Sequence, residues 1–138
     1  MVYLTRREHF NAAHRLFNPN WSEEKNVEIF GKCANPNWHG HNYQLFVTVK
    51  GNPDPNTGFI MDAKKLSDLI KQEIVDVFDH KNLNMDCPQF TDLLPSTENF
   101  CIVIWNILEP KITGGVLHGI KLVETENIYA EYFGPKTA

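Results

Sequence analysis

Two segments of the chain alternate apolar and polar residues with the period of two that is typical of β-strands. In the first, residues 3–16, one face carries Phe10, Ala12 and His14. In the second, residues 39–50, one face carries His39, His41, Tyr43, Leu45, Val47 and Val49. The residues between these segments are rich in Asn, Pro and Ser, so they predict a long loop with room for one helical turn.

Two later segments repeat apolar residues at helical spacing. The first follows Asp62, a good N-cap, and its apolar positions indicate a helix of about four turns. These positions are Leu66, Leu69, Ile70, Ile74, Val77 and Phe78. The second helix is expected to begin at Ser96 or Thr97 and to be stopped by Pro110. Residues 79–95, between the two helices, predict a loop.

The remaining segments complete a sheet. Residues 51–58 are rich in turn formers, and the apolar run 59–61 then predicts a short returning antiparallel strand. Two apolar segments flank Glu126 and Asn127 and predict a closing hairpin. The order strand, strand, helix, helix, strand, strand indicates an α+β fold with helices on one face of an antiparallel sheet. No linker or repeat divides the chain, so residues 1–138 are expected to form a single domain.

Composition narrows the class of protein. The 138 residues are 42% hydrophobic and 22% charged, with a formal net charge of −4, as in ordinary globular domains. Lys and Arg are scattered, so no nucleic-acid surface is expected. The N-terminus lacks the apolar core of a signal peptide, and no apolar run approaches ~18 residues, so no membrane association is expected. Three cysteines at irregular spacing favour a reducing compartment, and we expect a cytoplasmic protein.

The histidines suggest a metal site. On a strand, residues i and i+2 point the same way and lie about 7 Å apart, so His39 and His41 present two imidazoles to one side. His14, at the polar end of a neighbouring strand, is the natural candidate for a third ligand. Three neutral imidazoles with an open fourth position describe a catalytic zinc site. The alternative is that His-Gly-His is a polar strand entrance whose histidines are hydrogen-bonded surface groups.

Cys33 lies just upstream of the paired histidines, with five residues between it and His39. It could be a fourth zinc ligand, which would make the site structural. It could instead stand near the metal as a thiolate and act as a base. A third possibility, an inert buried thiol, is the interpretation adopted for Cys87 and Cys101.

Three further groups of polar residues are candidates for chemistry. Asp79 could orient the adjacent His80 imidazole, although both could equally be polar residues at a helix end. Residues 96–99 are by their chemistry mainly a helix start, with Glu98 favoured in the first turn. Glu124 ends a strand whose residues of the same parity look buried: Val116, Ile120 and Leu122. A carboxylate in line with a core face needs a partner, either a salt bridge or a ligand with paired N–H donors.

Five segments together carry a resemblance: HFNAAHRL, FGKCANPNWHGHNY, DHKNLN, STENF and LVET. In this order, over essentially the whole chain, they resemble the 6-pyruvoyl tetrahydropterin synthase family. The resemblance implies the tunnelling fold, a four-stranded antiparallel sheet with two helices on one face. It also implies that three sheets close a barrel and that two trimers stack into a homohexamer, with active sites at subunit boundaries.

The resemblance also assigns roles to residues. The family's zinc ligands fall on His14, His39 and His41. Its catalytic residues fall on Cys33, Asp79 and His80. Its pterin-binding residues fall on Glu124, which anchors the ring, and on Thr97 and Glu98, which line the pocket. Trp38 departs from the family, whose members commonly have a small residue there, and this difference bears on the shape of the side-chain pocket.

The implied reaction is the zinc-dependent conversion of 7,8-dihydroneopterin triphosphate to 6-pyruvoyl tetrahydropterin with elimination of triphosphate. One alternative is 6-carboxytetrahydropterin synthase of queuosine (7-deazaguanine) biosynthesis, which shares fold, zinc and substrate. Those relatives usually have a shorter spacing between the cysteine and His-Gly-His, so the spacing here favours the pyruvoyl product. An alternative of another class is a non-catalytic, zinc-stabilised pterin-binding module, in which Cys33 would bind the metal.

Overall fold

The computed structural model describes residues 1–136 and contains one five-stranded sheet with the strand order β3-β1-β2-β4-β5. The strands are β1 (Val2–His14), β2 (His39–Gly51), β3 (Lys81–Asn82), β4 (Val116–Thr125) and β5 (Ile128–Tyr132). Neighbours among β1, β2, β4 and β5 pair antiparallel, whereas the two-residue β3 pairs parallel to β1. The expected four-stranded antiparallel sheet is therefore present, with one short parallel strand added at its edge.

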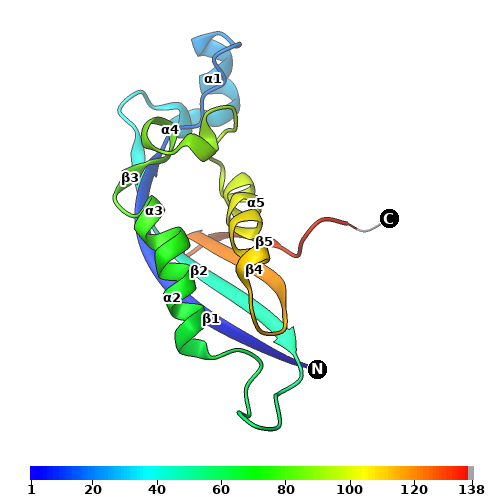
Figure 1. The fold of residues 1–138 in the computed structure, drawn as a ribbon. Helices are drawn as coiled ribbons and strands as arrows, with labels where there is room; N and C mark the ends of the chain where they lie inside the picture. Colours follow the sequence, from blue (N-terminus) through cyan, green and yellow to red (C-terminus); the bar gives the residue numbers. More distant parts are fainter. Residues whose placement is uncertain (137–138) are drawn as a thin grey trace.

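Three helices lie along one face of this sheet (Figure 1): α2 (Ala63–Ile70), α3 (Asp76–Phe78) and α5 (Thr97–Leu108). Two further helices are α1 (Glu23–Phe30) and α4 (Leu83–Asp86). A π-helical segment, Lys71–Val75, joins α2 to α3, so the predicted four-turn helix runs without a break from Ala63 to Phe78. Asp62 caps its start and Ser96 caps α5, as the sequence predicted. The short helices α1 and α4 lie together at one end of the molecule (Figure 1).

The core lies between the sheet and the two long helical segments. The predicted face of β2 is buried from Tyr43 to Val49, and Phe10 and Ala12 of β1 lie beside it. These residues pack against apolar residues of α2, α3 and α5, including Leu66, Phe78, Phe100 and Ile104. The α+β class is confirmed, because the long helical segments lie on one face of a largely antiparallel sheet.

The predicted strand at residues 59–61 is absent, and this prediction was wrong. β2 is already paired on both sides, with β1 along one edge and β4 along the other. A returning strand would therefore have no free edge of β2 to pair with. Instead Ile60 and Met61 pack as loop residues against the core. The two expected loops also contain more helix than predicted, since α1 and α4 lie within them.

The burial of β4 differs from the prediction at one end. Ile120 and Leu122 are buried as expected, but Val116 is exposed. The pairing of β4 with β2 shifts register opposite Thr48 and Val49, and such a bulge reverses which face the preceding residues take. Glu124 lies after the bulge, so it keeps the parity of Leu122 and points to the helix-covered face.

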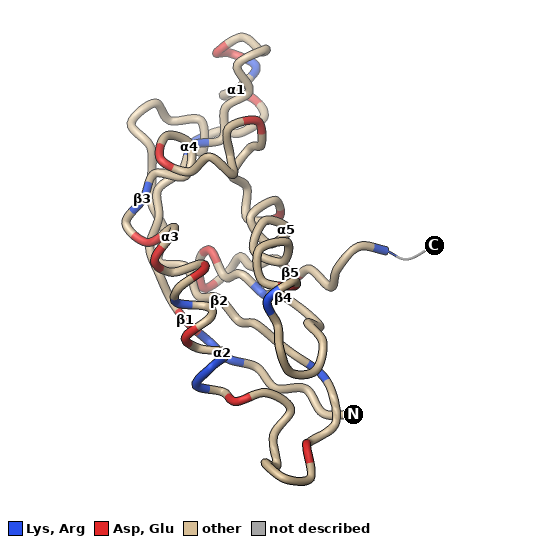
Figure 2. Tube along the Cα trace, viewed as in Figure 1, with Lys and Arg blue, Asp and Glu red and all other residues tan. Residues whose placement is uncertain are grey.

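Acidic and basic residues are interspersed along the trace, without one large basic patch (Figure 2). No helix within residues 1–136 has both the length and the apolar character needed to cross a bilayer.

Candidate metal centre and active site

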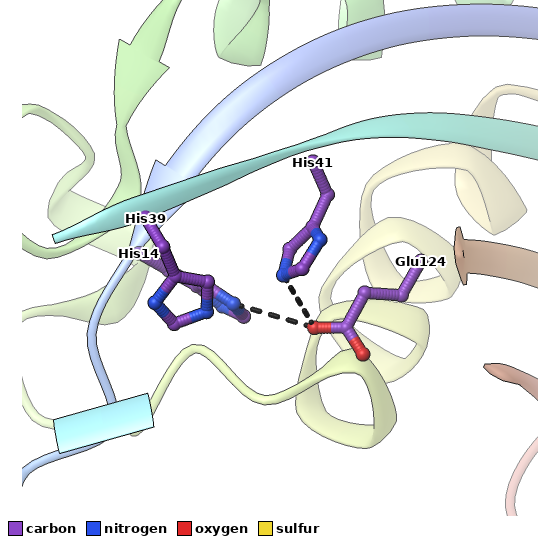
Figure 3. Close-up of side chains that lie close together, drawn as sticks. All are labelled: His14, His39, His41 and Glu124. Carbon is purple, nitrogen blue, oxygen red and sulfur yellow. Dashed lines mark ion pairs between the residues drawn. The ribbon is translucent and has the colours of Figure 1, made fainter. Parts of the chain in front are cut away.

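The ends of three strands bring three histidines and one glutamate together (Figure 3). His14 is the last residue of β1 and pairs with His39, the first residue of β2. His41 shares the face of His39, and Glu124 comes from the end of the adjacent strand β4. One potential ligand atom from each of the four residues lies within 4.8 Å of the other three. The three histidines predicted from the sequence are thus gathered, and Glu124 joins them.

The orientation of His14 is set by the backbone. Its Nδ1 lies 2.7 Å from the carbonyl oxygen of Pro95, in the loop before α5. A carbonyl only accepts hydrogen bonds, so Nδ1 carries a proton and donates, which leaves Nε2 directed into the cluster. This contact is typical of metal-ligating histidines, and no sequence pattern marks a backbone carbonyl that plays such a part.

Unsatisfied polar atoms gather at the same place. Within residues 1–136, five buried side-chain atoms have no hydrogen-bond partner: His14 Nε2, His39 Nδ1, His41 Nε2, Tyr43 Oη and Thr97 Oγ1. Tyr43 packs with its ring 5.7 Å from that of His41, and Thr97 lies close enough to Glu124 to lower the pKa of that carboxyl slightly. Buried polar atoms normally have partners, so this cluster is built to receive a ligand.

The protonation states suit a cation. Burial lowers the pKa of His39 and of His41, so both imidazoles are neutral at pH 7 and their lone pairs are available. Contact with the His14 ring is the largest influence on Glu124 and lowers the pKa of its carboxyl, while burial acts in the opposite direction. Three imidazole nitrogens and one carboxylate oxygen form a donor set that fits zinc.

Cys33 lies beside this cluster but outside it. It belongs to a 3-10 turn, Gly31–Ala34, and its carbonyl accepts a hydrogen bond from the N–H of Leu16, just beyond β1. Burial raises the pKa of the Cys33 thiol, and the charge of Glu124 raises it further. The thiol is free and is not one of the four clustered ligand residues. Cys87 and Cys101 are buried free thiols, as predicted.

Asp79 and His80 form a dyad directly after α3. Asp79 Oδ2 lies 2.9 Å from His80 Nδ1, and its other oxygen accepts the N–H of Asn11. This backbone hydrogen bond is the main cause of the lowered pKa of Asp79, and His80 contributes. His80 has a positive φ of 59°, and its side chain is largely exposed. Its backbone N–H donates to the Asn11 carbonyl of β1.

Within one chain the dyad does not meet the histidine cluster. His80 borders a cleft of about 560 Å³ that Asn11, Ala13, Gly40 and Asn42 also line, and His41 reaches the same cleft. By strand alternation Asn11, Ala13, Gly40 and Asn42 lie on the face opposite the one that the clustered histidines share. Within residues 1–136 no hydrogen bond or ion pair joins the dyad to Cys33 or to the clustered histidines.

The residues expected around the pterin lie at the start of α5. Thr97 is buried and Glu98 is exposed in the first turn, next to the cap residue Ser96. Trp38 precedes His39 with a positive φ of 65°, a conformation that favours glycine. It lines a second cleft of about 500 Å³ together with Arg15, Phe17 and Pro95.

Comparison with known proteins identifies the family. The sequence model of the 6-pyruvoyl tetrahydropterin synthase family matches residues 3–135. The chain is 45% identical over 131 residues to the 6-pyruvoyl tetrahydrobiopterin synthase of Pongo abelii, covering 95% of this chain and 90% of that protein. It is 28% identical over 149 residues to the 6-carboxy-5,6,7,8-tetrahydropterin synthase of Rickettsia typhi, covering 95% and 99%.

The fold agrees with this assignment. The structure of Caenorhabditis elegans 6-pyruvoyl tetrahydropterin synthase superposes with a TM-score of 0.92 at 35% identity, covering 97% of this chain and 96% of that one. Sequence and fold thus agree over nearly the whole chain, and the chain belongs to the 6-pyruvoyl tetrahydropterin synthase family.

Proposed function

We propose that this protein is a 6-pyruvoyl tetrahydropterin synthase, which converts 7,8-dihydroneopterin triphosphate to 6-pyruvoyl tetrahydropterin with elimination of triphosphate. The observation that carries the proposal is a partly buried three-histidine cluster with a free thiol beside it, in a chain of this family. Identity of 45% to a 6-pyruvoyl synthase, against 28% to a 6-carboxy synthase, favours the pyruvoyl product.

The metal of this proposal is zinc, held by His14, His39 and His41. Neutral imidazoles and a tetrahedral donor arrangement suit zinc, and the orphaned nitrogens of the cluster support a bound cation. When bound, zinc would supply a +2 charge that acidifies the side-chain hydroxyls of the substrate. The hydrogen bond from His14 to the Pro95 carbonyl would keep that ring in the ligating tautomer.

Cys33 is proposed as the base that removes a proton from a side-chain carbon of the substrate. Burial and the Glu124 charge keep it a thiol in the metal-free chain. A cation in the cluster would oppose both effects, because a nearby positive charge favours the thiolate. The role therefore requires the thiol to stay unbound to the metal, and its absence from the cluster supports this.

The Asp79–His80 dyad is proposed to return or relay protons. Asp79 holds Nδ1 of His80, which fixes the ring and leaves Nε2 for chemistry. Since no hydrogen bond or ion pair within residues 1–136 joins this dyad to Cys33 of the same chain, a second copy would supply the dyad to each site. A homohexamer of two stacked trimers, with sites at subunit boundaries, would meet that need.

Glu124 is proposed to anchor the pterin ring by accepting hydrogen bonds from its N2 and N3 donors. An ionised acceptor in a partly dry pocket strengthens such bonds and discriminates against rings that lack the donors. Thr97, whose buried hydroxyl has no partner among residues 1–136, and Glu98 of the same helical turn are proposed to line the pocket.

The test is to incubate the purified zinc-loaded protein with 7,8-dihydroneopterin triphosphate and identify the product by mass spectrometry. Release of triphosphate with formation of 6-pyruvoyl tetrahydropterin would support the proposal. Loss of a two-carbon aldehyde would instead identify a 6-carboxytetrahydropterin synthase. Binding without any product would identify a non-catalytic pterin-binding module. The three free thiols agree with action in a reducing compartment, and we propose the cytoplasm.

A further inference from the structure

The position of Glu124 differs from that expected of a residue whose only role is to bind the pterin ring. Its Oε1 lies 3.0 Å from His41 Nε2 and 3.3 Å from His14 Nε2, inside the histidine cluster (Figure 3). The side chain is 15% exposed, so the carboxylate is largely withdrawn from solvent. A group whose task is only to bind a ring would face the open pocket.

The contact with His14 involves the nitrogen that the backbone leaves unused. Nδ1 of His14 donates to the Pro95 carbonyl, so Nε2 is the nitrogen that faces Glu124, at 3.3 Å from Oε1. His14 Nε2 and His41 Nε2 both lack a hydrogen bond of acceptable geometry, although Glu124 is within reach of each.

The distances match a shared ion. Zinc bonds of about 2.0–2.1 Å in a tetrahedron place neighbouring ligand atoms about 3.3 Å apart. The separations of 3.0 and 3.3 Å between Glu124 and the two nitrogens are close to this value. The Glu124 oxygen and these two nitrogens are thus spaced as ligands of one ion would be, and the His39 ligand atom lies within 4.8 Å of all three.

We propose that Glu124 is the fourth ligand of the metal while no substrate is bound, and that the pterin ring removes it from the metal. The proposal deepens the function argued above and rests on it. Paired N–H donors of a pterin need both carboxylate oxygens, so Oε1 cannot serve ring and metal together. Recognition of the ring would break the Glu124–metal bond and free that coordination position for the substrate side chain.

The consequence is a metal that is closed until the correct ring arrives. A four-coordinate site with protein ligands alone is chemically quiet, whereas an open position supports catalysis. Molecules that lack the paired donors would leave Glu124 on the metal and would not gain access to it. One residue would thereby couple ring recognition to metal availability.

Cobalt(II) in place of zinc tests this, because its visible absorption reports the ligand set. We expect Glu124→Gln to alter the spectrum of the substrate-free protein and to weaken metal binding by about tenfold or more in competition with a chelator. Glu126→Gln, an exposed carboxylate in the neighbouring turn, is the matched control and should change neither. A spectrum and affinity for Glu124→Gln equal to those of wild type would overturn the proposal.

The displacement is tested with pterin itself, which has the ring donors but no side chain to bind the metal. Pterin should shift the cobalt spectrum of wild type and leave that of Glu124→Gln unchanged. A wild-type spectrum that pterin does not change would overturn the displacement. Glu124→Asp, which keeps the charge but shortens the reach, provides a second variant should Glu124→Gln fold poorly, and should resemble Glu124→Gln in the spectrum.

The outcome is separable from that of the proposed function. Product analysis of the zinc protein reports the reaction, whereas the cobalt spectrum reports the ligand. A protein that forms 6-pyruvoyl tetrahydropterin but shows no spectral dependence on Glu124 would keep the function and lose this inference. A protein whose cobalt spectrum depends on Glu124 but which forms no product would keep this inference and lose the proposed function.

Discussion

At the scale of single residues, the site is defined by polar atoms that the fold buries without partners. Fixing them there is unfavourable in the absence of a ligand, because buried donors and acceptors normally find partners. His14, His41, Tyr43 and Thr97 all contribute such atoms. These atoms thus lower the stability of the ligand-free protein at this end of the sheet, as is common at active sites.

Cys33→Ala should separate metal binding from chemistry. The thiol lies outside the ligand cluster, so the variant should keep its zinc and its affinity for pterin. Turnover should fall by about 10²–10⁴-fold, the usual contribution of a positioned base. Metal analysis and product assays check both parts, with Cys87→Ala, a buried thiol outside the site, as the control. Unchanged turnover would remove Cys33 from the mechanism.

Tyr43→Phe should stabilise the metal-free protein. The Tyr43 hydroxyl is fully buried without a partner, and burial strongly raises its pKa, so it is a neutral, unsatisfied group. Its removal should raise the free energy of unfolding by about 1 kcal/mol, since the ring keeps its packing against Phe10 and Phe100. Urea unfolding in the presence of a chelator measures this, and a loss of stability would mean that the hydroxyl has a partner.

At the scale of elements, the strands deliver the ligands because their ends coincide. The pairing of β1 with β2 sets His14 opposite His39, and strand alternation then sets His41 on the same face. The bulge in β4 changes which face its residues take. Val116, before the bulge, is exposed, whereas Glu124, after it, shares the face of the buried Leu122 and so lies beside the histidines. Register, more than any single contact, therefore builds the site.

Gly115→Ala should disturb the start of β4. Gly115 has a φ of +66°, and a Cβ there would overlap the carbonyl oxygen of Lys50 and the side chain of Ile60. Backbone strain and overpacking together should cost about 2–4 kcal/mol. Gly58→Ala, with a φ of +79° but no atom within 4 Å of its Cβ, isolates the backbone part of the cost. Thermal unfolding compares the two, and equal losses would show that the clash is relieved.

At the scale of the whole molecule, the sheet is incomplete. β5 has a free outer edge, and β3 pairs only with Ala12 and Ala13 of β1, which leaves the rest of that edge open in residues 1–136. Open edges favour pairing with further strands. This agrees with the proposed closure of three sheets into a barrel, and with a site that needs the dyad of another copy.

Mixing inactive variants tests whether sites are shared. Cys33→Ala and His80→Ala should each be nearly inactive alone. Co-refolded in equal amounts, they should regain activity at about a quarter of the sites by random assortment, provided each site takes Cys33 and His80 from different copies. The assay is turnover of the mixture, with native mass spectrometry to confirm mixed oligomers. Mixed oligomers without recovered activity would place both residues of a site in one chain.

Local patterns in the sequence were enough to determine much of this protein. Alternation in residues 39–50 predicted which side chains of β2 are buried, and helical spacing with the caps Asp62 and Ser96 predicted the two long helices. The same alternation placed His39 and His41 on one face. These features depend on periodicity and neighbouring residues, so the chain specifies them locally.

Only the tertiary structure decided the remaining features, because they depend on which strands pair with one another and in what register. Residues 59–61 could not form a strand once β1 and β4 had occupied both sides of β2. The bulge in β4, the Pro95 carbonyl that orients His14, and the entry of Glu124 among the imidazoles are likewise contacts between distant segments. No local pattern carries them, since each exists only when segments far apart in the chain meet.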